Sequence, residues 1–222
     1  MSKSWIWKAA APWVLGCGLV ALGCGGGGGA ESGGPVRLVV GLSSEPDSFN
    51  VYLARSAASL LVADLVLPRL AREELPFNGH PGGLVPALAR SWEITDQGRR
   101  VNVYLEAGRS WDDGQPIVCQ DLQFTLRAQT SAEVAWRGAS IKRHIEDLEC
   151  PDPLTAVYHF DRGYPGQVMD INDLHLLSRS LESIPFDQWR KTDWARAMVA
   201  GGPFRIESVA AGQEIVLGRR VP

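Results

Sequence analysis

Leu84 to Glu93 reads LVPALARSWE, and Trp111 to Leu122 reads WDDGQPIVCQDL. The second stretch contains Asp113-Gly114, a pair that tolerates the positive φ of a tight turn, and Pro116, which suits the start of a helix. It therefore predicts a turn followed by a helix on which Cys119, Leu122 and Leu126 share a face.

The residues between these two stretches alternate in polarity. Trp92 and Ile94 precede the turn-forming segment 95–98, after which apolar side chains recur at every second position from Val101 to Leu105. A period of two is typical of a strand with one buried face. Residues 92–105 are therefore predicted to form a β-hairpin, and Trp92 and Trp111 are interpreted as core aromatics in preference to ligand-stacking ones.

Similar patterns extend in both directions. Residues 36–40 (VRLVV) predict a buried strand, and 56–67 predict a helix with Ser56 as N-cap and Pro68 as terminator. On that helix, Leu61 and Leu65 lie four apart, as do Val62 and Val66. Further strands are expected at 145–148 and 156–160, with a closing hairpin over 204–217. The fold class predicted is mixed α/β and β-rich.

The N-terminus has the layout of an export signal. Lys3 and Lys8 precede an uncharged run over 9–23, which is too short to span a bilayer. The run ends in Ala21-Leu22-Gly23-Cys24, which resembles a bacterial lipobox, so residues 1–23 are interpreted as a lipoprotein signal peptide and Cys24 as the lipidated residue. Cys17 is a second candidate, and an ordinary cleaved signal is the alternative. The glycine-rich segment 24–34 then serves as a flexible tether.

The composition is that of an ordinary globular chain. Of 222 residues, 45% are hydrophobic and 21% are charged, which argues against disorder. The formal net charge of −3 provides no basic surface for a phosphate backbone, so nucleic acid is not an expected partner.

Two cysteines remain in the predicted folded part, Cys119 and Cys150. In an oxidising compartment such a pair is a disulfide candidate, although two unpaired buried cysteines would fit the sequence equally well. The spacing matches neither a CxxC pair nor a zinc site.

The order of these segments resembles the N-terminal part of the bacterial extracellular solute-binding proteins of family 5, the oligopeptide-, dipeptide- and nickel-binding components of ABC importers. The resemblance covers the chain from about Val36 to its last residue. The matching segments are Ser44–Asn50, Leu84–Glu93, Arg100–Leu105, Trp111–Leu122 and Gly201–Phe204. Two departures are Val118, where the family has a helix-capping threonine, and Asn50-Val51, where it has Asp-Pro.

The resemblance implies a class II periplasmic-binding-protein-like fold in which two lobes close on a ligand. Residues 35–222 would form an incomplete first lobe with an inserted subdomain, and the second lobe would be missing. An exposed apolar face is then expected on the closing hairpin, formed by Ile206, Val209, Ile215 and Leu217.

The ligand-binding residues implied by the resemblance are those of the loop before the first helix. They map to Leu53, Ala54, Arg55 and Ser56, and Arg55 would meet a ligand carboxylate. The alternative is that Arg55 is a solvated loop charge and Ser56 only an N-cap.

Catalytic and metal-binding patterns are absent from the sequence. Asp112 and Asp113 are better explained by the turn than by acid–base chemistry, and the four histidines, His80, His144, His159 and His175, share no ligand spacing. No metal, no cofactor and no enzymatic activity are expected.

The function expected is capture of a peptide or related small solute outside the cytoplasmic membrane. The protein would be a membrane-anchored lipoprotein on the periplasmic side and would deliver its solute to an ABC permease. The alternative is a truncated single-lobe remnant that acts as an envelope interaction module or lacks solute binding, because half a cleft leaves ligand groups in water.

Overall fold

The computed structural model describes residues 37–76 and 82–220. The chain separates into two units, Met1–Val40 and Gly41–Pro222. Of the first unit only 37–40 are described. These residues form no strand, and the side chains of Leu38, Val39 and Val40 are 84%, 80% and 68% exposed. The prediction of a buried strand is wrong for them, because an apolar β-branched run becomes a strand only when another strand pairs with it, and no described strand does so.

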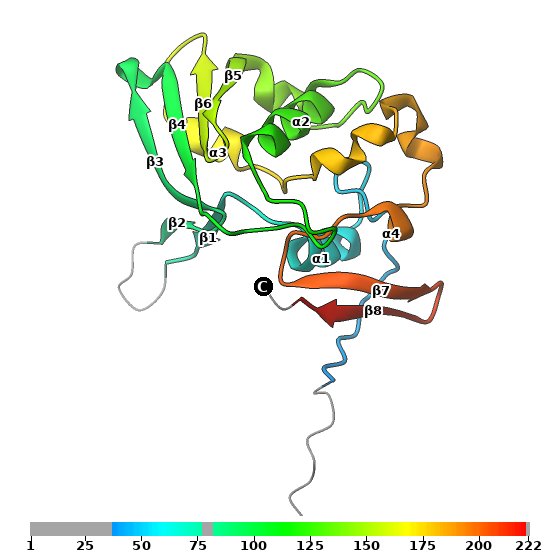
Figure 1. The fold of residues 1–222 in the computed structure, drawn as a ribbon. Helices are drawn as coiled ribbons and strands as arrows, with labels where there is room; N and C mark the ends of the chain where they lie inside the picture. The colour runs from blue at the N-terminus through cyan, green and yellow to red at the C-terminus, as the bar shows by residue number, and fades with distance from the viewer. Residues whose placement is uncertain (1–36, 77–81, 221–222) are drawn as a thin grey trace, which may run out of the picture. The chain divides into compact units, whose positions relative to one another are not determined.

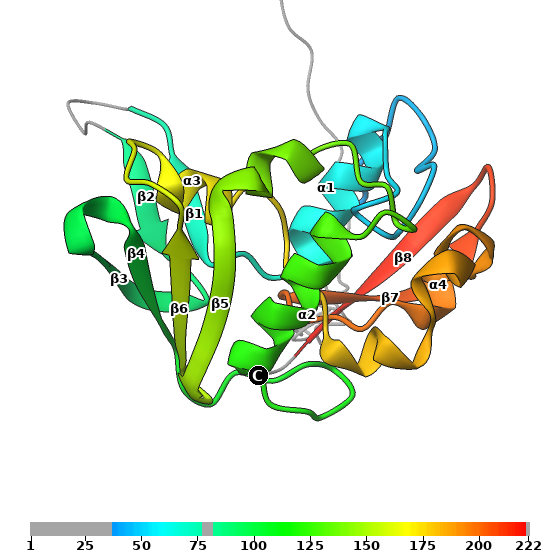
Figure 2. The same cartoon turned by 90° about the horizontal axis from the view of Figure 1, so that it is seen from above.

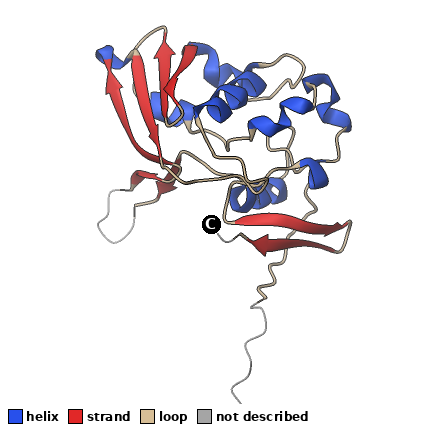
Figure 3. Ribbon diagram, in the orientation of Figure 1, coloured by secondary structure: helices blue, strands red, loops and turns tan. Residues whose placement is uncertain are grey.

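The second unit is mixed α/β, as expected, and its strands form three separate antiparallel sheets (Figure 3). The largest has the strand order β3-β4-β6-β5. The other two are the pairs β1-β2 and β7-β8. The strands are β1 (Ala71–Glu74), β2 (Gly83–Pro86), β3 (Ala89–Thr95), β4 (Arg100–Leu105), β5 (Ile145–Asp152), β6 (Thr155–Phe160), β7 (Phe204–Ala210) and β8 (Glu214–Arg219).

Helices pack against two of these sheets. α2 packs against β5 and β6 of the large sheet, and α1 and α4 contact β7 of the closing hairpin (Figures 1 and 2). The helices are α1 (Ala57–Val66), α2 (Cys119–Thr130), α3 (Gln167–Ile171) and α4 (Trp194–Ala197), with 3₁₀ turns η1 (Asp96–Gly98), η2 (Ala139–His144), η3 (Arg179–Ser183) and η4 (Phe186–Lys191).

The predicted hairpin is formed by β3 and β4. Val101, Val103 and Leu105 of β4 are at most 2% exposed, so the alternation identified the buried face correctly. Ile94 lies opposite Val101 but is 52% exposed, because β3 is an edge strand of the sheet. Trp111 is 1% exposed and belongs to the core, and Trp92 packs against the core while half-buried.

α1 begins and ends where the sequence predicts. The hydroxyl of Ser56 accepts from the N–H of Ser59, and Leu67 caps the other end before Pro68. Only one of the two predicted stripes is buried, however. Val62 and Val66 lie in the core, whereas Leu61 and Leu65 are 55% and 41% exposed, since adjacent helical stripes are distinguished only by where the rest of the chain packs.

A disulfide joins Cys119, the first residue of α2, to Cys150 on β5, with a Cα–Cα distance of 5.7 Å. It crosses between a helix and the edge strand of the large sheet.

The apolar face expected on the closing hairpin is smaller than predicted. Ile206, Ile215 and Leu217 are half-buried and pack against the core, and only Val209, at 38%, is exposed. α1 and α4 supply the contacts to β7 that the prediction attributed to missing chain.

Candidate functional site

The segment that precedes α1, residues 43–56, is called the 43–56 loop here, and Asp47 organises it. The carboxylate of Asp47 accepts hydrogen bonds from the N–H groups of Arg55 and Ser56 at 3.0 and 3.1 Å, and from the hydroxyl of Ser59 at 2.7 Å. Because these donors come from the two residues before α1 and from its first turn, Asp47 fixes the loop to the N-terminal end of the helix.

These hydrogen bonds determine the ionisation of Asp47. Partial burial by itself would raise the pKa of the carboxyl. The hydrogen bonds from Ser59, Arg55 and Ser56 favour the charged form more strongly and lower the pKa to about 2. The carboxylate is therefore ionised throughout the physiological range.

The middle of the loop is fixed to the protein core. Buried Asn50 accepts the N–H groups of Leu53 and Ala54 on its carbonyl and that of Tyr52 on its side chain. The hydroxyl of Tyr52 donates to the carbonyl of His175 at 2.5 Å and accepts from Gln129 at 3.1 Å. Burial raises the pKa of Tyr52 well above its usual value, so the phenol stays protonated. The 43–56 loop is thus held at both ends and in its middle.

The four residues expected to bind ligand have different environments. Leu53 and Ala54 are half-buried, Ser56 uses its hydroxyl as the N-cap of α1, and Arg55 is exposed. The guanidinium of Arg55 forms no hydrogen bond or ion pair with any residue in the described part of the chain, whereas its backbone N–H is held by Asp47. The loop therefore presents one unpaired cation from a fixed backbone.

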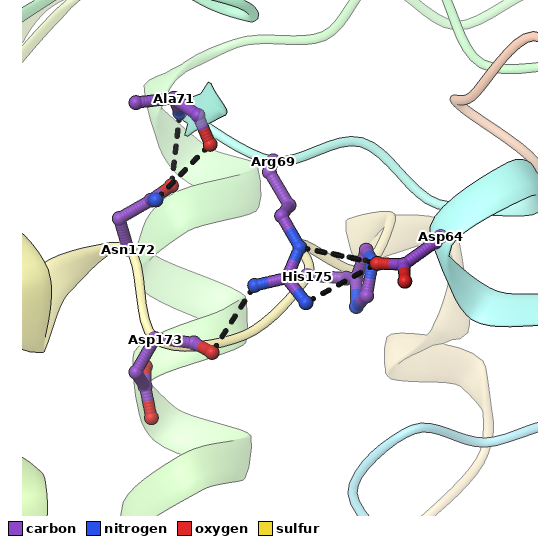
Figure 4. Close-up of polar contacts among 6 residues, drawn as sticks. All are labelled: Asp64, Arg69, Ala71, Asn172, Asp173 and His175. Atoms are coloured by element: carbon purple, nitrogen blue, oxygen red, sulfur yellow. Dashed lines mark hydrogen bonds and ion pairs between the residues drawn. The ribbon is translucent and has the colours of Figure 1, made fainter. Parts of the chain in front are cut away.

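A polar network behind the loop was not predicted from the sequence (Figure 4). Nε2 of buried His175 lies 2.7 Å from the carboxylate of Asp64, and the guanidinium of Arg69 lies 3.2 Å from the same oxygen. The short distance assigns the Nε2 proton to the bond with Asp64, so the approach of Arg69 Nε to that nitrogen at 3.2 Å is a contact without a hydrogen bond. Arg69 also donates to the carbonyl of Asp173 at 3.2 Å. The network connects the last turns of α1 to the 172–175 segment.

In both His175 and Asp64, burial and hydrogen bonding shift the pKa in opposite directions. Burial lowers the pKa of His175, although its hydrogen bond to Asp64 opposes the shift. The hydrogen bond from His175 lowers the pKa of Asp64. We infer that a neutral His175 donates to an ionised Asp64 at neutral pH. No sequence pattern marks His175, whose partners lie more than a hundred residues away.

Beside this network, the side chain of Asn172 substitutes for a strand neighbour. It accepts from the N–H of Ala71 at 2.9 Å and donates to the carbonyl of Ala71 at 3.0 Å (Figure 4). The pair holds the start of β1 in place.

The turn before α2 and the Gly201-Gly202 pair, both in segments that match the family, meet in space. Asp112, in the turn before α2, exchanges hydrogen bonds of 2.8 Å with the N–H and carbonyl of Ala200. The N–H groups of Gly201 and Gly202 then donate to the carbonyl of Val66 at the end of α1, at 3.0 and 2.7 Å. The turn and the glycine pair thereby connect α1, α2 and the closing hairpin, and support the 43–56 loop indirectly through α1.

Residues 83–221 match the family model described as bacterial extracellular solute-binding proteins, family 5, middle region. This match covers more than half of the chain. The chain belongs to family 5 of the bacterial extracellular solute-binding proteins.

A curated relative supports the assignment over a shorter segment. The chain is 36% identical over 94 residues to a probable deoxycholate-binding periplasmic protein, YgiS, of Escherichia coli (strain K12). The match covers 41% of this chain and 16% of that protein.

Solved structures show the same fold. The substrate-binding protein CtaP of Listeria monocytogenes gives a TM-score of 0.69 at 21% identity, covering 81% of this chain and 36% of its own. OppA of Haemophilus influenzae, in complex with the peptide RPPGFSPFR, gives 0.67 at 22% identity, covering 79% and 36%. NikZ of Campylobacter jejuni, in complex with Ni(L-His), gives 0.62 at 20% identity, covering 71% and 30%. This family 5 chain therefore spans about one third of the length of the solved binding proteins that it matches.

No group of three or more His, Cys, Asp or Glu side chains within 37–76 and 82–220 is arranged to hold a metal ion. No helix in the described part of the chain is long and apolar enough to cross a membrane. Cys24, the expected lipidation site, and the predicted tether lie outside the described residues.

Proposed function

We propose that this family 5 chain supplies the first lobe of an extracytoplasmic solute-binding protein that captures a peptide or related small solute for an ABC permease. The observation that carries the proposal is the family match over 83–221. The solutes named with the similar proteins, which include the peptide RPPGFSPFR and deoxycholate, make peptides and small organic anions the first classes to test. Binding without catalysis is the activity proposed.

We also propose that the 43–56 loop forms part of the ligand site. Arg55 projects an unpaired guanidinium from a backbone that Asp47 has already fixed. A guanidinium binds a carboxylate through two parallel hydrogen bonds, and a preformed loop loses little conformational entropy on binding. Leu53, Ala54 and Ser56 would line the same edge.

The ligand test is native mass spectrometry of the full chain mixed with a peptide pool. We expect retained peptides, and at least tenfold weaker retention after Arg55→Ala, since one charge-assisted pair is lost. Arg100→Ala, an exposed arginine on β4, is the matched control and should bind like the unaltered chain. If no peptide is retained, peptide binding by this chain is ruled out. Co-purification of an envelope protein other than a permease would then favour an interaction module.

Membrane anchoring is a separate part of the proposal. Residues 1–23 would be removed as a signal peptide, Cys24 would carry lipid, and 24–34 would connect it to the lobe over 35–222. Labelling of cells with a radioactive fatty acid should mark the protein, and Cys24→Ala should abolish the label while Cys17→Ala leaves it unchanged. Loss of label in the Cys17 variant alone would move the site to Cys17.

A further inference from the structure

A second polar site lies at η2. It is a cavity of about 270 Å³ lined by residues of η2, of the segment that follows β6 and of α3. It shares no residue with the 43–56 loop. The lining residues are Ser140, Ile141, Arg143, His144, Arg162, Tyr164 and Asp170.

Two arginines converge on one nitrogen in this cavity. Nε of Arg143 and Nη2 of Arg162 both lie 2.9 Å from Nε2 of His144. The other ring nitrogen, Nδ1, lies 3.0 Å from the carboxylate of Asp161, which accepts its proton and fixes the orientation of the ring. Nε2 therefore offers a single lone pair to two cationic donors.

The arginines have carboxylates nearby but no ion pair with a described residue. The hydrogen bond from His144, and after it the charge of Arg162, lower the pKa of Asp161. Neither guanidinium has a carboxylate oxygen within ion-pair distance among the described residues. Asp170 is the one carboxylate that lines the cavity, and its Oδ2 accepts the hydroxyl of Tyr164 at 2.6 Å. Burial, and after it that hydrogen bond, raises the pKa of Tyr164 above its usual value, so the hydroxyl stays a donor to Asp170.

The geometry points to a binding site for a small oxyanion. Two guanidiniums whose donor atoms lie at most about 6 Å apart repel one another, and a ligand with two or three acceptor oxygens would relieve the repulsion by bridging them. Each guanidinium keeps further N–H donors that no described residue uses. Ile141 and Tyr164 also line the cavity. Its size and its two guanidiniums fit a small carboxylate or a phosphate.

The test is a titration of the full, ¹⁵N-labelled chain followed by NMR. Inorganic phosphate and acetate are added separately, and sodium chloride at equal ionic strength is the salt control. We expect saturable shifts of the arginine Nε–H signals of Arg143 and Arg162 and of the backbone amides around Ser140 with at least one of the two oxyanions. Chloride should give none.

Variants make the result specific to the cavity. Arg143→Gln with Arg162→Gln should abolish saturation, and either change alone should weaken binding about tenfold. Because both side chains are exposed, the fold should survive, which unfolding curves can verify. The control pair Arg196→Gln with Arg205→Gln removes two exposed arginines elsewhere and should bind normally. Absence of saturable shifts, equal shifts with chloride, or undiminished binding by the double variant would each overturn the proposal.

Discussion

At the scale of single residues, Asp47 determines the conformation of the 43–56 loop. Its carboxylate accepts three donors: the N–H groups of Arg55 and Ser56 and the hydroxyl of Ser59. Asp47 therefore has a structural role that does not depend on a bound ligand.

Replacement of this residue tests that role. Asp47→Ala should lower the free energy of unfolding by about 1–2 kcal/mol at pH 7, because several hydrogen bonds to a charged acceptor are lost. The folded-state pKa of Asp47 is about 2, below the usual 3.8, so its contribution to stability is complete above about pH 4 and is lost as the pH falls toward 2. Urea unfolding from pH 2 to 7 should show the two chains converging at low pH. Glu106→Ala, a change at an exposed carboxylate, should give no such trend.

At Gly202 the neighbouring backbone leaves no room for a side chain. A Cβ there would lie 2.6 Å from the carbonyl oxygen of Leu65, a backbone atom that cannot move aside. Gly202→Ala should therefore cost about 1–3 kcal/mol in urea unfolding. Gly41→Ala, where a Cβ meets nothing within 4 Å, is the matched control. Equal stability of the two variants would show that the glycine pair is not held against α1.

At the scale of elements, α2 is capped in a way the family pattern does not suggest. Val118 has no side-chain oxygen to serve as a cap, but the carboxylate of Asp121 accepts the N–H of Val118 and, through its other oxygen, the N–H of Arg179, both at 2.8 Å. Burial raises the pKa of Asp121 even though these bonds oppose the shift. The helix start is thus stabilised by a residue within its first turn and is connected to η3.

The disulfide at the same helix start permits a quantitative test. Closure of the loop between Cys119 and Cys150, a separation of 31 residues, restricts the unfolded chain and should contribute about 3–4 kcal/mol. Cys119→Ala with Cys150→Ala should lower the free energy of unfolding by about that amount. A reductant should destabilise the unaltered chain equally and leave the double variant unchanged. If reductant affects neither, the cysteines do not pair in solution.

At the scale of the whole second unit, a buried ion pair joins η2 to the segment after α3. The ammonium of Lys142, with 1% of its side chain exposed, contacts the carboxylate of Asp173 and the carbonyl of Asp170. Burial lowers the pKa of Lys142 and raises that of Asp173, so each group depends on the other to remain charged.

Removal of Lys142 alone should therefore lower the free energy of unfolding more than removal of both Lys142 and Asp173. Lys142→Met should cost about 3 kcal/mol or more, because it leaves Asp173 buried without its cation. Lys142→Met with Asp173→Leu should recover at least half of that loss. Lys191→Met, at an exposed lysine, is the control, and urea unfolding is the measurement. A double variant no more stable than the single one would show that the pair is stabilising by itself.

Much of the architecture was predictable because its signals are local. The alternation in β4, the cap at Ser56 and the Asp-Gly turn before α2 are all set by residues within one element, and each was placed correctly. The order of the motifs also identified the family, which the match over 83–221 confirms. The role of Leu53–Ser56 in ligand binding is still a prediction.

Tertiary structure decided the features that depend on which distant segments meet. It left Leu38 to Val40 without a strand partner, exposed Leu61 while burying Val62, and packed Ile206, Ile215 and Leu217 of the closing hairpin against the core. It also created the Asp64–Arg69–His175 network and the convergence of Arg143 and Arg162 on His144. Sequence patterning reports the periodicity of an element but not the identity of its neighbours, and burial, pairing and electrostatic environment are properties of those neighbours.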